Sequence, residues 1–353
     1  MTSQLPSTMR ALRKSTPGEG LSLADVPVPE PGPSEVLVRV TASSICGTDV
    51  HIYNWDRWSA GRIRPPVTLG HEFAGEVVAL GEGIDASELP LGTPVSAEGH
   101  ILLPGAKHVV PGQEHLATDM EVIGIDRDGA FANYVVVPRE NLWVNAAGLP
   151  PEIASLQDPF GNAVHTVDAQ PVDGRRVLIT GGGGLIGLMA VAVARASGAE
   201  QILVTDVNPR RFDIARRMGA DEAFDASDDP VDAIFGATGG AGVDVLLEMS
   251  GHPVAIDQGF RALRPGGDVA ALGLPGRPIE LDWAQHVVQK GATVRGIYGR
   301  RIWQTWHRMR ELLASDAVDL SPLITHRLPL EDFQEGFDAM RAGDSLKVIL
   351  IPS

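Results

Sequence analysis

The chain has 353 residues, a length that favours two domains over one. Hydrophobic residues make up 44% of it and charged residues 21%, which is ordinary for a globular protein. The formal net charge is −16, so electrostatic repulsion argues against nucleic acid or an anionic membrane surface as a partner.

Cys46 is the only cysteine. No internal disulfide can therefore form, which fits a reducing, cytoplasmic location. The N-terminal segment MTSQLPSTMRALRK has no apolar run of signal-peptide length. Residues 177–194 carry no charge, but four consecutive glycines at 181–184 predict a strand, a tight turn and a buried helix there rather than a membrane span.

The chain from Met9 to about Val144 consists of short apolar runs separated by glycine and proline, as at 35–43, 74–80 and 131–138. Such runs with frequent turn residues predict an irregular β domain.

From about Gln170 the pattern changes to strand-like apolar runs that alternate with helix-like ones. This alternation predicts an α/β domain with a doubly wound parallel sheet covered on both faces. It fades near Tyr298, and the rest of the chain contains a helix pattern and a final strand pattern. We therefore expect residues 1–158 and 299–353 to form one domain and residues 159–298 the other.

The run RRVLIT leads into Gly182-x-Gly184-x-x-Gly187 and then into a helix pattern. This strand–turn–helix context is what a dinucleotide fingerprint requires, because the turn brings backbone N–H groups to the pyrophosphate. Asp206 follows roughly 20 residues later, where a carboxylate binds the adenosine ribose of NAD and repels the 2′-phosphate of NADP. A glycine run can also be a turn without a ligand, and Arg211 is compatible with NADP.

A second group of residues suggests a metal site. Cys46, Thr48 and His51 lie close together, and His71 and Glu72 follow. Thiolate and imidazole are good zinc ligands, and a catalytic zinc keeps one position open for water or substrate. Each residue taken singly has an ordinary structural explanation, but next to a dinucleotide domain the set indicates a catalytic metal.

Long stretches of the chain resemble the zinc-containing medium-chain alcohol dehydrogenases, and within them the branch that oxidises L-threonine. The matching stretches are CGTDVHIYNWDRW (46–58), GHEFA (70–74), EGHIL (98–102), DPFGNAVHT (158–166), VTDVNP (204–209), LEMSGH (247–252), GIYGRR (296–301) and LSPLITHRL (320–328). The resemblance implies a β-rich, GroES-like catalytic domain and a Rossmann domain.

The resemblance also implies roles for individual residues. Cys46, His71 and Glu72 are expected to bind zinc, and Asp158 is expected to be a ligand or to lie beside the metal. Either Glu72 or Asp158 would complete the coordination. Thr48 and His51 are expected to relay a proton, with His100 near the substrate. The residues expected to contact NAD are Ile186, Asp206, Arg211, Leu272, Gly273, Leu274, Ile297 and Tyr298.

The expected reaction is oxidation of L-threonine to 2-amino-3-ketobutyrate by hydride transfer to NAD. Another vicinal amino alcohol or a polyol is an alternative substrate for the same mechanism. The family also implies a homo-oligomer, with a tetramer favoured. A metal-free reductase of the same fold, or a non-enzymatic NAD-binding protein, would leave the zinc ligands and the Thr48–His51 pair without a purpose.

The sequence departs from this family in one lobe. Family members usually bind a second, structural zinc with four cysteines, and the corresponding positions are Leu103, Ala106, Val109 and Ala117. His108 and His115 remain, but two imidazoles make a poor structural zinc site. We therefore expect one catalytic zinc per subunit, and a lobe that folds without metal as Leu103 and Val109 pack in its interior.

Overall fold

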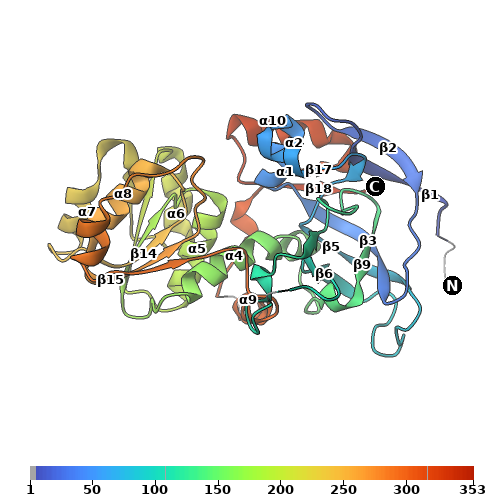
Figure 1. Cartoon of the computed structure of the whole chain (residues 1–353), viewed down its shortest axis with the longest axis horizontal. Coiled ribbons are helices and arrows are strands. Elements are labelled where there is room, and N and C mark those ends of the chain that lie inside the picture. The colour runs from blue at the N-terminus through green and yellow to red at the C-terminus, as the bar shows by residue number, and fades with distance from the viewer. Residues whose placement is uncertain (1–4, 108, 316) are drawn as a thin grey trace. The chain divides into compact units, whose positions relative to one another are not determined.

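The computed structural model describes residues 5–107, 109–315 and 317–353. The chain divides into two compact units, one of Met1–Asp158 with Leu323–Ser353 and the other of Pro159–Pro322 (Figure 1). Among the described residues, no helix combines the length and the apolar character that crossing a membrane would need.

The first unit is built mainly on antiparallel strands, although β17 and β18 pair in parallel. A seven-stranded sheet has the order β10-β6-β5-β3-β18-β17, with β9 paired to β3, and smaller sheets have the orders β2-β1-β4 and β7-β8. The strands are β1 (Thr8–Lys14), β2 (Ser22–Pro27), β3 (Glu35–Ser44), β4 (Val67–Thr68), β5 (Phe73–Leu80), β6 (Pro94–Ala97), β7 (His100–Leu102), β8 (Met120–Val122), β9 (Tyr134–Pro138), β10 (Leu142–Val144), β17 (Ile324–Pro329) and β18 (Lys347–Ile351). This arrangement is the predicted irregular β domain.

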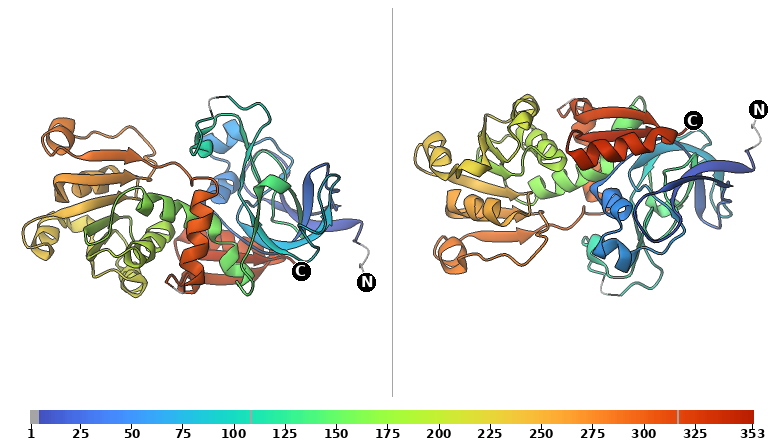
Figure 2. Two further views of the ribbon diagram at one scale, coloured as in Figure 1. Left: turned by 90° about the horizontal axis from the view of Figure 1, so that it is seen from below. Right: turned by 90° about the horizontal axis from the view of Figure 1, so that it is seen from above.

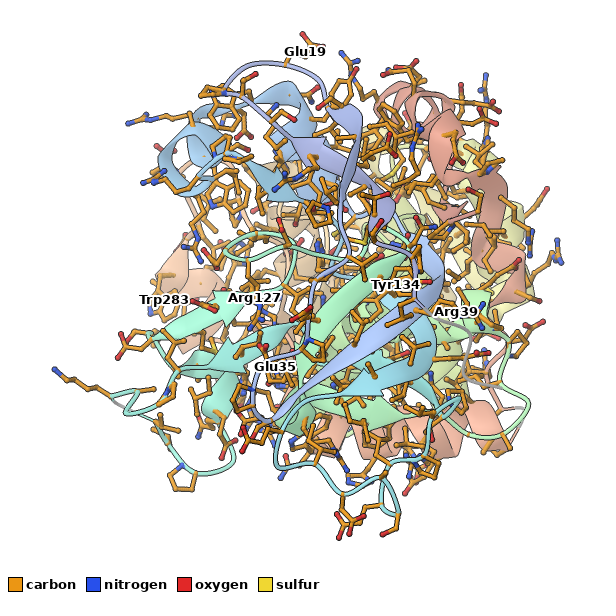
Figure 3. All side chains as sticks on the ribbon, turned by 90° about the vertical axis from the view of Figure 1, so that its right-hand side faces the viewer. Glu19, Glu35, Arg39, Arg127, Tyr134 and Trp283 are labelled. Carbon is orange, nitrogen blue, oxygen red and sulfur yellow. The ribbon has the colours of Figure 1, made fainter. Side chains whose placement is uncertain are left out.

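Strand β3 holds the large sheet together, because it pairs with β5, β9 and β18. Its apolar side chains are buried in a core that β5, β6, β9 and β10 share. An ion pair of 2.7 Å between Arg127 and Glu35 fastens the start of β3 to the loop before β9 (Figure 3).

A second core in this unit lies under helices α1 (Gly47–Asn54) and α10 (Phe333–Ala342). The rings of Tyr53 on α1 and Phe337 on α10 stack with centroids 5.1 Å apart. The remaining helical segments of the unit are α2 (Arg57–Arg62), α3 (Pro151–Ala154), η1 (Glu114–Leu116), η2 (Arg139–Asn141), η6 (Ser321–Leu323), which spans the division, and η7 (Leu330–Asp332).

The second unit contains a six-stranded parallel sheet with the order β13-β12-β11-β14-β15-β16. The strands are β11 (Arg176–Thr180), β12 (Gln201–Asp206), β13 (Glu222–Asp225), β14 (Val243–Glu248), β15 (Leu263–Ala271) and β16 (Thr293–Gly296). The helices are α4 (Gln157–Asp168), whose first two residues belong to the first unit, α5 (Leu185–Ala196), α6 (Phe212–Met218), α7 (Val231–Ala237), α8 (Pro253–Ala262) and α9 (Gln304–Ala314). The short helical segments are the 3-10 turns η3 (Pro209–Arg211) and η4 (Ala226–Asp228) and the π-helix η5 (Ala284–Val288).

This sheet confirms the predicted doubly wound arrangement. Helices cover both faces of the sheet (Figure 2). Strands β11 and β14 are accordingly buried over almost their whole length, with apolar runs at their centres. The strand order reverses between β11 and β14, and the crevice at such a point is where open parallel sheets bind ligands.

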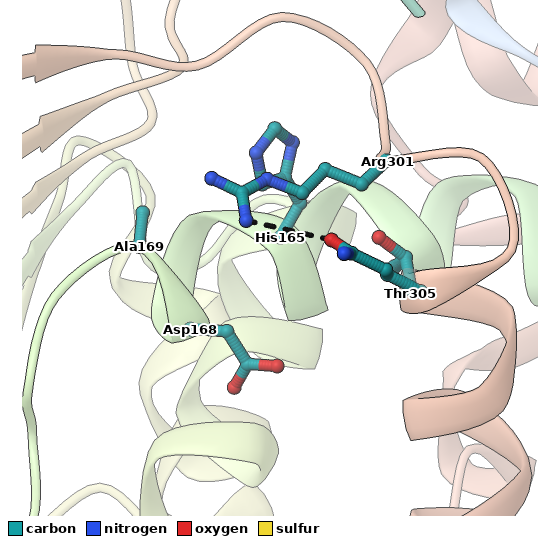
Figure 4. Close-up of a pocket in the computed structure, with 6 residues that line it drawn as sticks. His165, Asp168, Ala169, Arg301 and Thr305 are labelled. Atoms are coloured by element: carbon teal, nitrogen blue, oxygen red, sulfur yellow. Dashed lines mark hydrogen bonds between the residues drawn. The ribbon is translucent and has the colours of Figure 1, made fainter. Parts of the chain in front are cut away.

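Residues 299–322 belong to the second unit, whereas the sequence predicted a return to the first domain at residue 299. The reason is local packing against α4. His165 Nδ1 lies 2.9 Å from the carbonyl of Gly299, and Arg308 on α9 lies 3.8 Å from Asp168. Residues from α4 and from the start of α9 also line a cavity of about 80 Å³ (Figure 4).

A lysine caps the end of helix α8. Lys290 Nζ donates to the carbonyls of Phe260, Arg261 and Leu263 at 2.6, 3.0 and 2.5 Å. The last carbonyls of a helix lack intrahelical partners, and a cation is favourable beside them. Burial lowers the pKa of Lys290.

We expect Lys290→Met to destabilise the second unit by about 2–3 kcal/mol, because three carbonyls lose a charged donor. The thermal midpoint measured by calorimetry should fall by about 5–10 °C. Lys107→Met removes the same charge from an exposed side chain and should change stability by less than about 0.5 kcal/mol. Equal shifts in the two variants would contradict the capping role.

Candidate functional site

Three possible metal donors converge in the first unit. Cys46 precedes α1, and His71 and Glu72 lie in the loop that enters β5. Their donor atoms all lie within 4.8 Å of one another, and no other such group of three occurs in the described part of the chain. In a tetrahedral zinc site the ligand atoms are about 3.3–3.8 Å apart. The three side chains therefore need only a small adjustment to bind one ion.

Asp49 supports this group, although the sequence reasoning gave it no role. Its Oδ2 accepts the N–H of Cys46 at 2.9 Å, and its Oδ1 lies 3.8 Å from Nδ1 of His71. Both Oδ1 and Nδ1 are buried without a hydrogen-bond partner among the described residues. A carboxylate behind a histidine is a common arrangement around zinc, where it fixes the orientation of the ring. The signal available in the sequence was an acidic residue three positions after Cys46.

The electrostatic field at this group favours a positive charge. Burial alone would lower the pKa of His71, but the negative charges of Asp49 and Cys46 outweigh it and raise that pKa well above its ordinary value. Burial raises the pKa of Asp49 to about 6. A divalent cation would experience the same attractive field, so the donor set fits zinc in charge as well as in chemistry.

Glu72 has a second set of contacts that the sequence did not predict. Its Oε2 accepts hydrogen bonds from the hydroxyl of Ser44 and from the ammonium of Lys347 on β18. Lys347 Nζ also donates to the carbonyl of Ile45 at 3.0 Å, and all these side chains are buried. A lysine at the start of the otherwise apolar strand KVILI was the only sign of this contact in the sequence.

Asp158 is buried at the start of α4 and is not part of the three-donor group. Its charge nevertheless contributes to the raised pKa of His71, so it lies near the group. Glu72 is thus the carboxylate within the three-donor group, and Asp158 is a second carboxylate near it.

The two predicted relay residues lie one turn apart on α1. Thr48 Oγ1 lies 3.7 Å from Sγ of Cys46. The ring of His51 is 65% exposed, and its Nδ1 lies 2.7 Å from Oδ2 of Asp56. Asp56 is the N-cap residue of α2, and its side chain accepts the backbone N–H of Ser59. This hydrogen bond is the main reason why the pKa of Asp56 is lowered. An ionised Asp56 therefore orients His51 and leaves Nε2 of His51 facing away from the pair.

His100, predicted to lie near the substrate, is held by its neighbour. The Nδ1 and the backbone N–H of His100 lie 2.8 and 3.0 Å from Oε1 of Glu98, which is fully buried. Asn141 donates to the carbonyls of both residues. These contacts fix the orientation of the imidazole ring.

In the second unit the predicted dinucleotide residues meet at the end of β11. The glycine loop leads into α5, and Gly184 is its N-cap residue. Asp206, at the end of β12, accepts the N–H of Gly183 at 2.9 Å. A Cβ atom at Gly182 would lie 2.5 Å from the side chain of Val204. Any residue other than glycine would therefore collide with Val204 in this turn. The free N–H groups at the start of α5, near Ile186 and Gly187, suit a pyrophosphate.

The other residues predicted to contact NAD lie at the same edge of the sheet. Leu272 to Leu274 follow β15, and Ile297 and Tyr298 follow β16. Leu274 and Tyr298 are 82% and 55% exposed, whereas Ile297 is buried. Arg211 lies beside the glycine loop, where a Cβ atom at Gly183 would come within 2.9 Å of its Cβ.

The altered lobe does not pack as predicted. Strands β7 and β8 pair at its base, and Asp119 binds the backbone N–H groups of Leu103 and Lys107 at 3.2 and 3.0 Å. The prediction that Leu103 fills the interior is wrong, because its side chain is 36% exposed. The buried residues of the lobe include Ala117 and His115, Val109 is half-buried, and His108 lies outside the described residues.

Two family models match the chain. Residues 32–147 match the alcohol dehydrogenase GroES-like domain, and residues 186–315 match the zinc-binding dehydrogenase model. The first match confirms the GroES-like assignment of the β-rich domain.

Relatives that match over nearly their full length belong to the same kind of enzyme. The chain is 48% identical to the L-threonine 3-dehydrogenase of Symbiobacterium thermophilum, over 99% of both chains. It is 46% identical to that of Bacillus subtilis, over 98% of this chain and 99% of the relative.

Solved structures of dehydrogenases also resemble this fold closely. A Sinorhizobium meliloti protein bound to NADP has a TM-score of 0.90 at 31% identity, and Bacillus subtilis 2R,3R-butanediol dehydrogenase has a TM-score of 0.88 at 28% identity. Each match covers 98% of this chain and all of the other. Since the identity extends over nearly the whole length of curated members and both domain models match, the chain belongs to the zinc-dependent medium-chain alcohol dehydrogenases.

Proposed function

We propose that this dehydrogenase oxidises L-threonine to 2-amino-3-ketobutyrate and passes a hydride to NAD. The observation that carries the proposal is the convergence of the Cys46, His71 and Glu72 donors in a chain 44–48% identical to proteins named L-threonine 3-dehydrogenase. In this reaction the hydride leaves the carbon that bears the hydroxyl, and the hydroxyl loses its proton.

Cys46 and His71 would hold a zinc ion together with Glu72 or Asp158. When bound, zinc supplies a Lewis acid that lowers the pKa of the substrate hydroxyl. Asp49 orients the imidazole of His71, and Lys347 holds Glu72 in place. The protein thus fixes the positions of the donors before a metal arrives, which reduces the cost of assembling the site.

The proton of the substrate hydroxyl would pass to Thr48 and leave through His51. The exposure of His51 suits release of the proton to water. An imidazole ring can accept a proton at one nitrogen and donate one, which suits it to proton transfer. Asp56 holds Nδ1 of His51, so Nε2 is the atom that would exchange the proton.

The decisive experiment follows NADH formation with L-threonine, other vicinal amino alcohols, 2,3-butanediol and polyols. We expect the highest kcat/KM with L-threonine. A chelator should abolish the activity, and one equivalent of zinc per chain should restore it. Strong activity on a polyol but none on L-threonine would refute the substrate assignment, and full activity after verified zinc removal would refute the metal mechanism.

The matched variant for this experiment is Cys46→Ser. Turnover should fall by about 1,000-fold, because the loss of the metal removes several kcal/mol of transition-state stabilisation. The dissociation constant for NADH should stay within about twofold, because the glycine loop and Asp206 belong to the other unit.

Asp206 is proposed to select NAD over NADP, although the Sinorhizobium meliloti structure holds NADP. In Asp206→Ser, the ratio of kcat/KM with NAD to that with NADP should fall by about 100-fold, the value of a lost charge-assisted hydrogen bond. Asp213→Ser removes the same charge from a side chain that is 95% exposed, and this ratio should not change. An unchanged ratio in Asp206→Ser would exclude this role.

We also propose a cytoplasmic homo-oligomer, with a tetramer favoured by the family resemblance. Strand β16 supports association, because it forms one edge of the parallel sheet and all four of its residues are exposed. An exposed strand edge is a surface that proteins usually cover. Light scattering at micromolar concentration should give a multiple of 37.4 kDa, and a monomer would contradict this part of the proposal.

A further inference from the structure

Glu248 ends strand β14 as a buried acid, with 2% of its surface exposed. Its Oε1 accepts the N–H groups of Ser250 and Gly251 at 3.0 Å each. It also accepts the hydroxyls of Ser250 at 2.5 Å and Thr180 at 3.3 Å. All these contacts suit an ionised carboxylate, which only accepts hydrogen bonds.

No cation neutralises this carboxylate in the described part of the chain. None of the ion pairs there includes Glu248, although Asp244 on the same strand binds two arginines, Arg176 and Arg264. Buried carboxylates are normally paired with a positive group, because an isolated charge is costly to desolvate. Four donors offset part of this cost, but they leave a net negative charge at the end of β14.

Gly273 brings this charge to the edge of the sheet where the nucleotide is proposed to bind. A Cβ atom at Gly273 would lie 2.5 Å from Oε2 of Glu248, so a side chain at this position would displace the carboxylate. The backbone N–H groups of Leu272 and Gly273 also bind the carbonyl of Glu248, at 2.8 and 3.1 Å. The carboxylate therefore lies directly behind the segment that follows β15.

The strand order indicates which half of a dinucleotide lies there. A sheet of this order binds one mononucleotide half on each side of the point where the order reverses. Asp206, the proposed ribose ligand, ends β12 on the adenosine side. The nicotinamide half therefore belongs to the ends of β14, β15 and β16, where Glu248 and Gly273 lie.

We propose that the negative charge of Glu248 strengthens the binding of the oxidised cofactor relative to that of the reduced cofactor. The nicotinamide ring carries a positive charge in NAD and none in NADH, so a nearby buried anion stabilises only the oxidised form. This inference rests on the proposed function, because it requires NAD as the cofactor. It assigns Glu248 a role in promoting release of the reduced product.

The test compares the dissociation constants of NAD and NADH for the full-length protein and for Glu248→Gln. NADH is titrated by its fluorescence, and NAD is titrated by displacement of bound NADH. The Kd ratio of NAD to NADH should rise by about tenfold in the variant, because only NAD loses an electrostatic partner. Glu222→Gln removes a charge from an exposed position on β13 of the same sheet and should leave the ratio unchanged.

If Glu248 has only a structural role, Glu248→Gln should weaken the binding of NAD and NADH by the same factor. This outcome would overturn the inference but not the proposal that NAD is the cofactor. A parent protein that binds neither nucleotide would overturn both. If circular dichroism shows that Glu248→Gln is unfolded, Ser250→Ala decides, because it keeps the charge and removes one compensating hydroxyl. A lower Kd ratio in Ser250→Ala supports the inference, and an unchanged or higher ratio overturns it.

Discussion

The ion pair between Lys347 and Glu72 joins strand β18 to the loop that carries two of the three converging donors. Both side chains are buried, and the lysine also binds the carbonyl of Ile45, next to Cys46. Removing one partner of such a pair leaves an uncompensated buried charge, which typically costs about 3–5 kcal/mol. The geometry of the metal group thus depends on a strand distant in sequence, and that strand is itself fixed between β3 and β17.

The two units manage buried charge in different ways. In the first unit, Cys46 and Asp49 create a field around His71 that attracts a positive charge. Asp49 Oδ1 and His71 Nδ1 are buried and have no hydrogen-bond partner among the residues that the structure describes, which suits a cation that binds during function. In the second unit, Arg176 and Arg264 hold the pKa of Asp244 well below its usual range, although burial alone would raise it. Asp244 therefore forms permanent structural ion pairs with the two arginines. In the described part of the chain, Glu248 on the same strand accepts hydrogen bonds from neutral donors only.

The sequence predicted the elements that depend on local pattern. Strand–helix alternation was enough for the parallel sheet. Residue chemistry together with the family resemblance predicted that Cys46, His71 and Glu72 form one group, and their donor atoms do converge. The sequence did not reveal Asp49, Lys347 or Glu248, because each acts through partners that only the tertiary structure brings near. The exposure of Leu103 and the packing of α9 on α4 were also missed, since an apolar residue or an amphipathic helix does not specify the surface it will cover.

The first unit is discontinuous in sequence, since residues 323–353 complete a sheet that residues 1–158 begin. During synthesis the chain must therefore produce the whole second unit before β18 can pair with β3. Until then Glu72 lacks its lysine. Strand β9 already pairs with residues 35–39 of β3, but the Ser43–Ser44 end of β3 lacks the pairing that β18 provides. The nascent protein can thus form a nucleotide-binding unit before its metal donors are held in place, and a ribosome that stalls in the last 31 residues (323–353) would leave this site unfinished.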